Sequence, residues 1–256
     1  MNNDNFGDWR IEAVTTIVQD VPAAYPGGPS HRAGTPVYKA SVTKHAEYNT
    51  IGFVTPSPIA LALNTAARNA FLAQELRREL ILRDVVTPWG AGKSVANENL
   101  PHLYDFFESC MIAVISSFQS LEMFSNVEIS RHPERKFQLK RKRAGLILSA
   151  GDLERKGSTD EKIGDILPEL LGIQSPRGNA LWEEYLELKK ARDATVHLKA
   201  RDMYTGKDID SESLFFQFFQ RDASEHPRTA FKIIEYFHRG RELPRWCMAA
   251  KLLLAK

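Results

Sequence analysis

Arg192 and His197 are the two side chains of this 256-residue chain whose types and spacing most clearly suggest chemistry. An arginine carries a permanent planar charge that pairs with two phosphate oxygens at once. A histidine is the side chain that takes up or releases a proton near neutral pH. Asp193 follows the arginine directly, and no set of metal-ligating residues accompanies the pair in the sequence. The chemistry that the pair suggests is therefore cleavage of an RNA phosphodiester without a metal ion.

Both residues fall late in a predicted amphipathic helix over 180–199. Arg192 continues the apolar stripe of this helix, which is formed by Leu181, Tyr185 and Leu188. A charge in such a stripe needs a partner or a cavity. On a straight helix, five residues separate Arg192 from His197 by about 140° around the axis. The pair converges only if the helix ends or distorts between them, if the arginine reaches round, or if two subunits share one cleft. The alternative is an interhelical salt bridge and a solvated histidine.

Composition indicates an ordinary globular protein, since 43% of the residues are hydrophobic and 26% are charged. The formal net charge of +2 does not by itself indicate a nucleic-acid partner. Cys110 and Cys247 form no CxxC pair, and the histidines form no zinc-binding motif, so we expect reduced thiols, no metal and no cofactor. The sequence shows no secretory signal, and its longest apolar stretch is far below the roughly 20 residues that span a membrane. We therefore expect a cytoplasmic protein without a membrane segment.

The pattern of apolar residues predicts a mainly α protein in two parts. Residues 1–98 are expected to form a small mixed β/α segment, with strands over 9–18 and 36–44 and a helix that Ser57 and Pro58 open and that runs to about residue 83. Residues 99–256 are expected to form a helical bundle. Its predicted helices cover 103–125, 158–171 with a possible break at Pro168, 180–199, 211–221, 227–240 and a last segment from Pro244.

Glu122 and Asn126 are polar residues four positions apart on an otherwise apolar helix. Such residues need hydrogen-bonding partners. In a catalytic interpretation Glu122 orients Arg192 or His197 across the bundle. The alternatives are a buried hydrogen-bonded network that fixes the register of the helices, or plain exposure to solvent.

A strongly basic run covers residues 131–143. Its candidate contacts to an RNA backbone are Arg135, Lys136, Lys140, Arg141, Lys142 and Arg143. The alternative is a solvated linker between helices, which is the usual fate of a charge run. A nuclear-localisation signal is a further possibility that nothing else in the sequence favours.

The segment Gly90–Ser94, GAGKS, has the end of a phosphate-binding loop but not its beginning. The full motif needs a glycine at the position of Thr87, and no clean helix follows Ser94. We therefore expect a flexible interdomain loop here rather than a nucleotide site.

The residues around Arg192 resemble the HEPN domain family. The family signature is an arginine, usually followed by a polar residue, with a histidine four to six positions beyond it, and Asp193 occupies the polar position. The surrounding segments TDEKIGDILPELLG and WEEYLELKKARDATVH are similar to the family's, and SFQSLEMFSN at 117–126 is similar to its second motif region. The resemblance covers about residues 100–240 and implies a HEPN-like helical bundle.

The resemblance also implies a metal-independent endoribonuclease of the toxin–antitoxin or antiphage kind. In such enzymes the ribose 2′-hydroxyl attacks the adjacent phosphate, with His197 as general base or acid, Arg192 stabilising the phosphorane and Asp193 supporting them. The implied partners are an RNA substrate, a second copy in a homodimer, and an antitoxin or another regulatory protein. The alternative within the family is a non-catalytic module that binds a nucleotide, an RNA or a protein.

Overall fold

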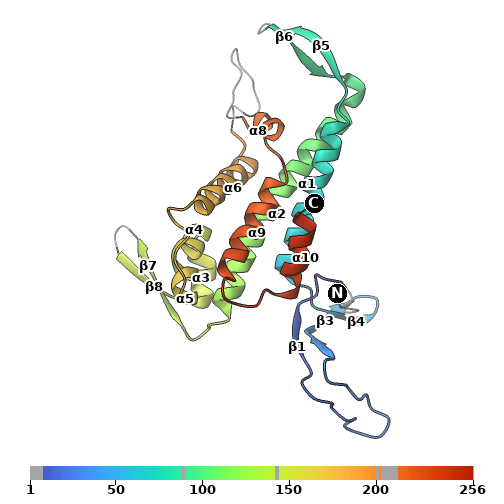
Figure 1. Ribbon diagram of the computed structural model, residues 1–256, viewed down its shortest axis with the longest axis vertical. Coiled ribbons are helices and arrows are strands. Elements are labelled where there is room, and N and C mark those ends of the chain that lie inside the picture. The colour runs from blue at the N-terminus through green and yellow to red at the C-terminus, as the bar shows by residue number, and fades with distance from the viewer. Residues whose placement is uncertain (1–7, 88–89, 142–143, 200–201, 203–212, 256) are drawn as a thin grey trace.

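The protein is mainly α-helical, as predicted, with strands arranged as small antiparallel hairpins around the helices (Figure 1). A computed structural model describes residues 8–87, 90–141, 144–199, 202 and 213–255. The helices are α1 (Pro58–Arg78), α2 (Leu100–Ser130), α3 (Ala150–Lys156), α4 (Thr159–Glu161), α5 (Leu167–Leu171), α6 (Ala180–Val196), α8 (Leu214–Gln220), α9 (Glu225–Phe237) and α10 (Arg245–Leu254). None of the described helices is long and apolar enough to cross a membrane.

The centre of the molecule is the antiparallel pair α1 and α2, with α9 and α6 packed against α2 (Figure 1). Ser57 caps α1, where its Oγ accepts the N–H of Ala60 at 3.4 Å. A stripe of alanines lets the backbone of α1 approach α2 closely: Ala60, Ala66, Ala67, Ala70 and Ala73 are all fully buried. α2 has 31 residues and is therefore about 46 Å long. It forms the axis on which the other helices are placed.

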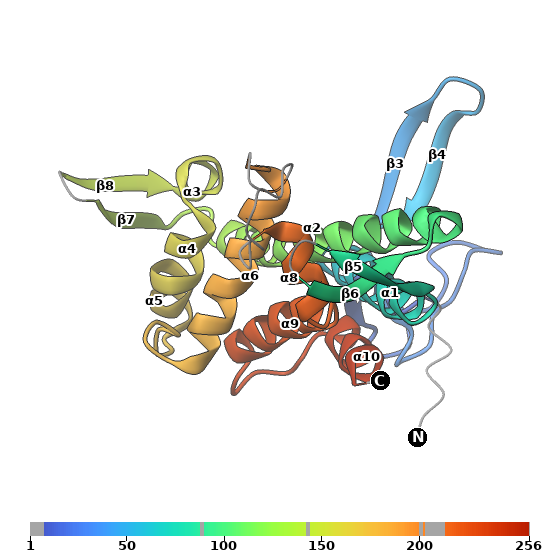
Figure 2. The same ribbon diagram turned by 90° about the horizontal axis from the view of Figure 1, so that it is seen from above.

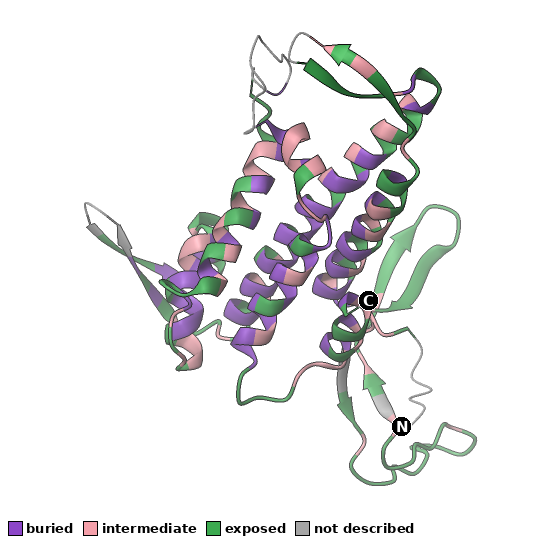
Figure 3. Cartoon of the chain, turned by 45° about the horizontal axis from the view of Figure 1, so that its top comes forward, coloured by how far each residue is buried: buried purple, intermediate pink, exposed green. Residues whose placement is uncertain are grey.

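One core crosses the expected boundary at residue 98. Leu63 of α1 packs in the same buried cluster as Leu121 of α2, Ile234 of α9 and Trp246 of α10. Figure 3 shows this buried band running along the facing sides of these helices. The helix of the segment 1–98 is thus an integral part of the bundle that 99–256 forms.

Strands occur in four hairpins among the described residues. They pair as β1 (Ala13–Thr16) with β2 (Pro36–Tyr38), β3 (Ala40–His45) with β4 (Asn49–Val54), β5 (Leu82–Thr87) with β6 (Gly90–Val95), and β7 (Lys136–Arg141) with β8 (Ala144–Ser149). In Figure 2, β3–β4 and β7–β8 stand away from the bundle on different sides. The single strand expected over 36–44 is divided at Lys39 into β2 and β3, which pair with different partners.

Two expectations for the loops are wrong. The helix α1 ends at Arg78 rather than near residue 83, because 82–87 pair with 90–95 as a hairpin. Gly90–Ser94 therefore lies in the strand β6, where Lys93 Nζ pairs with Asp84 Oδ1 at 2.6 Å. In the basic run 131–143, residues Lys136–Arg141 form the strand β7, which pairs with β8.

The helix predicted over 158–171 is present with an irregular middle. Ser158 and Glu161 form a reciprocal capping box at its start. Residues Lys162–Ile166 form a π-helical turn just before Pro168. Pro168 has no N–H to give to the carbonyl of Gly164, four residues earlier, and Ser175 Oγ donates to that carbonyl at 2.6 Å. The break expected at Pro168 is therefore a π-helical turn that lies just before the proline.

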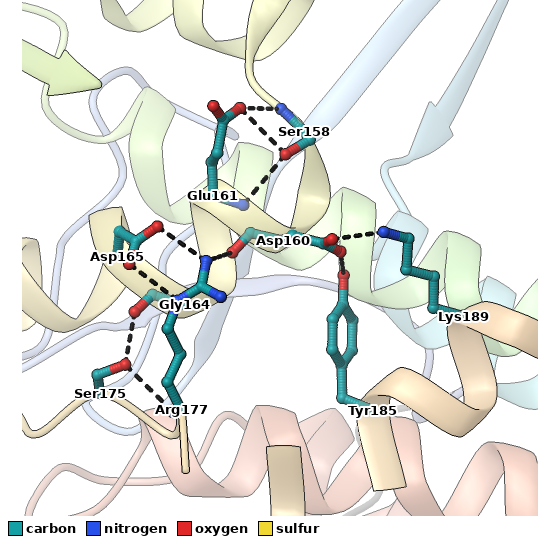
Figure 4. Close-up of polar contacts among 9 residues, drawn as sticks. All are labelled: Ser158, Asp160, Glu161, Gly164, Asp165, Ser175, Arg177, Tyr185 and Lys189. Atoms are coloured by element: carbon teal, nitrogen blue, oxygen red, sulfur yellow. Dashed lines mark hydrogen bonds and ion pairs between the residues drawn. The ribbon is translucent and has the colours of Figure 1, made fainter. Parts of the chain in front are cut away.

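Arg177 lies against this turn and joins it to α6 (Figure 4). Its Nε and Nη2 each donate to the Asp165 carboxylate at 2.9 Å, and its guanidinium lies 4.5 Å from the ring centre of Trp182. A Cβ atom on Gly164 would lie 2.4 Å from Arg177 Nε. Only glycine leaves room for the guanidinium in this position.

We therefore predict that Gly164→Ala destabilises the protein by about 1–2 kcal/mol, because the added methyl group displaces Arg177 from Asp165 and Trp182. Urea unfolding measures this change, and the effect should largely disappear in an Arg177→Ala background. Gly151→Ala in α3 is the matched control, since its Cβ meets no atom within 4 Å. Equal effects of Gly164→Ala in both backgrounds would show that Arg177 is not the cause.

Candidate functional site

An open cavity of about 510 Å³ lies at the C-terminal end of α6, against α8. We call it the α6 cleft. Its lining residues are Leu186, Lys189, Lys190, Asp193, Ala194, His197, Lys199, Asp202 and Gln217. Six of these, from Leu186 to His197, recur at the three- and four-residue spacing that defines one face of a helix. The cleft is therefore one face of α6, extended by the residues that follow it and closed by α8.

The end of α6 places His197 in the lining of this cleft. The helix stops at Val196, and the backbone of His197 leaves the helical path with φ −121° and ψ 67°. Its N–H makes the last helical hydrogen bond, to the carbonyl of Asp193 at 2.9 Å. The imidazole is exposed, on the same face as the Asp193 carboxylate. One condition for convergence, the end of the helix between Arg192 and His197, is thus met.

Arg192 nevertheless lies outside the lining of the cleft. Its guanidinium lies 4.4 Å from the ring centre of Phe118 of α2, and its Nη1 donates to Asp193 Oδ1 at 2.8 Å. The side chain is 31% exposed, so it is accessible from one side. Asp193 is the link between the two predicted residues, since it binds Arg192 and also lines the cleft with His197. Within one chain Arg192 and His197 do not share a cavity.

The structure places Glu122 and Asn126 beside Lys162 rather than beside Arg192 or His197. Asn126 Oδ1 accepts from Lys162 Nζ at 2.8 Å, and the carbonyl of Glu154 accepts from the same nitrogen at 2.9 Å. Lys162 is only 1% exposed. Burial lowers its pKa, and the charge of the exposed Glu122 partly opposes that effect. Glu122 and Asn126, the two predicted supporting residues, thus interact with a buried lysine that connects α2 to the helical turn at 162–166.

Sequence reasoning overlooked Lys162, although its position carries a signal. Thr159, Ile163, Ile166 and Leu167 are buried at helical spacing, and residue 162 belongs to the same face. A lysine on an apolar face must either reach solvent or find oxygen atoms inside the protein. Here it finds two.

The basic run lies far from the α6 cleft. Its hairpin β7–β8 follows the C-terminal end of α2. In contrast, α8 packs near the N-terminal end of α2, where the ring centres of Phe215 and Phe107 lie 4.8 Å apart. The 23 helical steps from Phe107 to Ser130 span about 35 Å, and Figure 1 shows β7–β8 and α8 at opposite ends of α2. The predicted RNA contacts therefore do not lead to His197.

Within that run, Arg135 pairs with Glu169 at 3.1 Å, so part of the predicted positive charge is neutralised locally. Lys136 begins the strand β7, which also contains Lys140 and Arg141. Lys142 and Arg143 lie outside the described residues.

The basic residues of the cleft itself were overlooked in the sequence. Lys189, Lys190 and Lys199 line it together with two aspartates. Lys189 Nζ pairs with Asp160 Oδ2, and Asp160 Oδ1 accepts the buried hydroxyl of Tyr185 (Figure 4). This bond and the burial of Tyr185 hold the lysine and the helix in a fixed position relative to 158–171. Lys189, Lys190 and His197 occur on one helix face, which is a signal that the sequence contains.

Asp202 shapes the other side of the cleft. It is only 7% exposed, and its two carboxylate oxygens accept the N–H groups of Lys199 at 2.9 Å and Leu214 at 2.8 Å. It thereby fastens the chain that leaves α6 to the first residue of α8. Gln217 of α8 completes the lining of the cleft.

Comparisons of the chain with profiles of protein families, with curated proteins and with solved structures give no match. The function must therefore be argued from the geometry and charge of the α6 cleft.

Proposed function

We propose that the chain is a metal-independent endoribonuclease of HEPN type, and that one phosphodiester of an RNA strand binds in the α6 cleft. The observation that carries the proposal is the shared position of His197 and three lysines in one open cavity of about 510 Å³. Lysines attract and hold phosphates, and an exposed imidazole beside them is placed to exchange a proton with the bound ribose or phosphate.

In the proposed reaction the ribose 2′-oxygen forms a bond to the adjacent phosphorus, and the bond from phosphorus to the 5′-oxygen breaks. His197 accepts the proton of the 2′-hydroxyl or donates one to the departing 5′-oxygen, and water serves the other transfer. The lysines stabilise the negative charge of the phosphorane. The products are a 2′,3′-cyclic phosphate and a 5′-hydroxyl, and no metal ion takes part.

Arg192 enters this proposal through Asp193. A phosphate that binds beside Asp193 competes with its carboxylate for the guanidinium, which holds that carboxylate through one hydrogen bond from Nη1 to Oδ1. In a homodimer, a second copy of the motif facing the first would bring further arginine and histidine side chains to the same strand. Asp193 thus has the proposed role of linking Arg192, which lies outside the lining, to the cleft.

A second candidate function is a HEPN module that binds RNA or a nucleotide without cleaving it. The observation that favours it is the position of Arg192, stacked on Phe118 and paired with Asp193 outside the lining of the cleft. In this candidate the lysines bind phosphate and His197 has no chemical role.

The test is incubation of the purified chain with total RNA and with tRNA in EDTA, beside an Arg192→Ala/His197→Ala variant. The endoribonuclease proposal predicts RNA fragments from the wild type and intact RNA with the variant. If the wild type binds RNA and leaves it intact, the second candidate replaces the first.

A further inference from the structure

A second basic cavity, of about 340 Å³, lies between the C-terminal end of α1 and the residues that follow α8. Its lining residues are Ala73, Gln74, Arg77, Arg78, Phe106, Arg221, Asp222 and Ala223. We call it the arginine pocket after Arg77 and Arg78, at the end of α1, and Arg221, directly after α8. Three arginines and one aspartate give its lining a net charge of +2.

The positive charge of this pocket is largely available to a ligand. In the part of the chain that the structure describes, neither Arg77 nor Arg78 forms an ion pair with a carboxylate, and both are exposed. Arg77 Nη1 makes one long hydrogen bond, to the carbonyl of Arg221 at 3.4 Å. Arg221 is different, because it pairs with Glu187.

The one acidic residue of the pocket is occupied by other partners. Asp222 Oδ1 accepts from Gln74 Nε2 at 2.6 Å and from the N–H of Ser224 at 2.9 Å, and its Oδ2 accepts from Ser224 Oγ at 2.8 Å. These bonds fix the turn between α8 and α9. Among the described residues, Arg77 and Arg78 thus have no carboxylate partner, and both line this cavity.

The linings of the arginine pocket and the α6 cleft come within one turn of each other at the end of α8. Gln217 lines the cleft, Arg221 lines the pocket, and the N–H of Arg221 donates to the carbonyl of Gln217 at 2.9 Å. Four residues of helix correspond to about 6 Å along α8. A flexible single strand held in the cleft can follow this turn, whereas a duplex is too stiff to bend within it.

We infer that the arginine pocket is a second phosphate-binding subsite, which holds a neighbouring phosphate of the single-stranded RNA that occupies the α6 cleft. Guanidinium groups bind phosphate oxygens through two parallel hydrogen bonds, so Arg77 and Arg78 together suit a backbone phosphate. The inference rests on the proposed function for the identity of the ligand. The same chemistry would also hold a free phosphate ion, and the experiment below separates the two sources.

The experiment measures binding of a single-stranded RNA of about 12 nucleotides by fluorescence anisotropy over a range of salt concentrations. All variants carry His197→Ala so that the RNA stays intact. Arg77→Gln/Arg78→Gln is expected to weaken binding roughly 20-fold at about 0.1 M salt, and to reduce the salt slope by about 1.4, the value for two lost phosphate contacts on a single strand. Arg77→Lys/Arg78→Lys should keep the slope and lose part of the affinity.

The matched control is Arg155→Gln/Lys156→Gln on α3, an adjacent basic pair with side chains 75% and 57% exposed. This control is expected to bind RNA with the affinity and the salt slope of the parent protein, which carries His197→Ala alone. The inference is overturned if the Arg77/Arg78 variant binds like the parent, or if the control pair loses as much. It is also overturned if inorganic phosphate displaces the RNA at concentrations comparable to those of the RNA itself, since the pocket would then be a site for the free ion.

The outcomes also distinguish failure of the subsite from failure of the proposed nuclease. RNA binding that depends on Arg77 and Arg78, with no cleavage by the protein that retains His197, would remove the nuclease and keep the subsite. RNA cleavage, together with RNA binding that does not change when Arg77 and Arg78 are replaced, would exclude the subsite alone. If RNA does not bind at all, both are excluded.

Discussion

Replacing His197 with alanine is expected to lower the rate of RNA cleavage by about 10²–10⁴-fold, the usual contribution of a general acid or base. The substitution should leave the free energy of unfolding nearly unchanged, because His197 is exposed and its structural hydrogen bond is made by the backbone. Single-turnover cleavage of a short RNA measures the first effect, and urea unfolding measures the second. A rate loss without a stability loss identifies a chemical role.

The control for this prediction is His31→Ala, which removes another exposed histidine, located outside the cleft. It should cleave at the wild-type rate. Arg192→Ala gives a useful contrast, since we expect it to lose activity and also roughly 1 kcal/mol of stability from its contacts with Phe118 and Asp193. Full activity of His197→Ala would contradict the assignment of the α6 cleft as the catalytic site.

Mild acid is expected to destabilise the protein by up to about 3 kcal/mol through His226. Burial lowers the pKa of this histidine from 6.5 to about 4, with a further contribution from Arg221 that Asp222 partly offsets. The unfolded chain takes up a proton below its ordinary pKa, whereas the folded protein does so only near the lowered value. Stability is therefore complete above a pH of about 6.5 and falls as the pH drops toward 4.

Urea unfolding at several pH values between about 7 and 4.5 measures this slope. His226→Leu is the test variant, because it fills the buried position of His226 without a titratable group. The free energy of unfolding of this variant should fall less steeply with decreasing pH than that of the wild type. Burial also lowers the pKa of His238, so a smaller slope of the same sign should remain. An unchanged slope in His226→Leu would show that the acid sensitivity has another source.

The helices of the bundle could be predicted because each turns an apolar stripe toward a core and begins at a recognisable residue. Ser57, Ser158 and Asn179 cap α1, α4 and α6, as their residue types indicate. The hairpins were mostly missed for the opposite reason. Every residue of β4 is exposed, and β6 is nearly so. A strand without a buried face has no alternation to detect.

Helix geometry explains which of the predicted site residues lie together. His197 and Asp193 share a face of α6 and line one cleft, whereas Arg192 points toward Phe118, as the calculated separation around the axis requires. The partner of Asn126 could not be predicted, because Lys162 lies 36 residues away and only the fold brings them together. Arg77 and Arg78 were overlooked because exposed arginines at a helix end are common, and their cavity forms only against the distant residues 221–223.

The most direct test of the central claim uses a DNA oligonucleotide that contains one ribonucleotide, incubated with the chain in EDTA. We predict cleavage on the 3′ side of that ribonucleotide only, with a 2′,3′-cyclic phosphate and a 5′-hydroxyl identified by mass spectrometry, and no cleavage by His197→Ala. Cleavage between deoxyribonucleotides, or products that carry a 5′-phosphate, would contradict an attack by the 2′-hydroxyl in the α6 cleft.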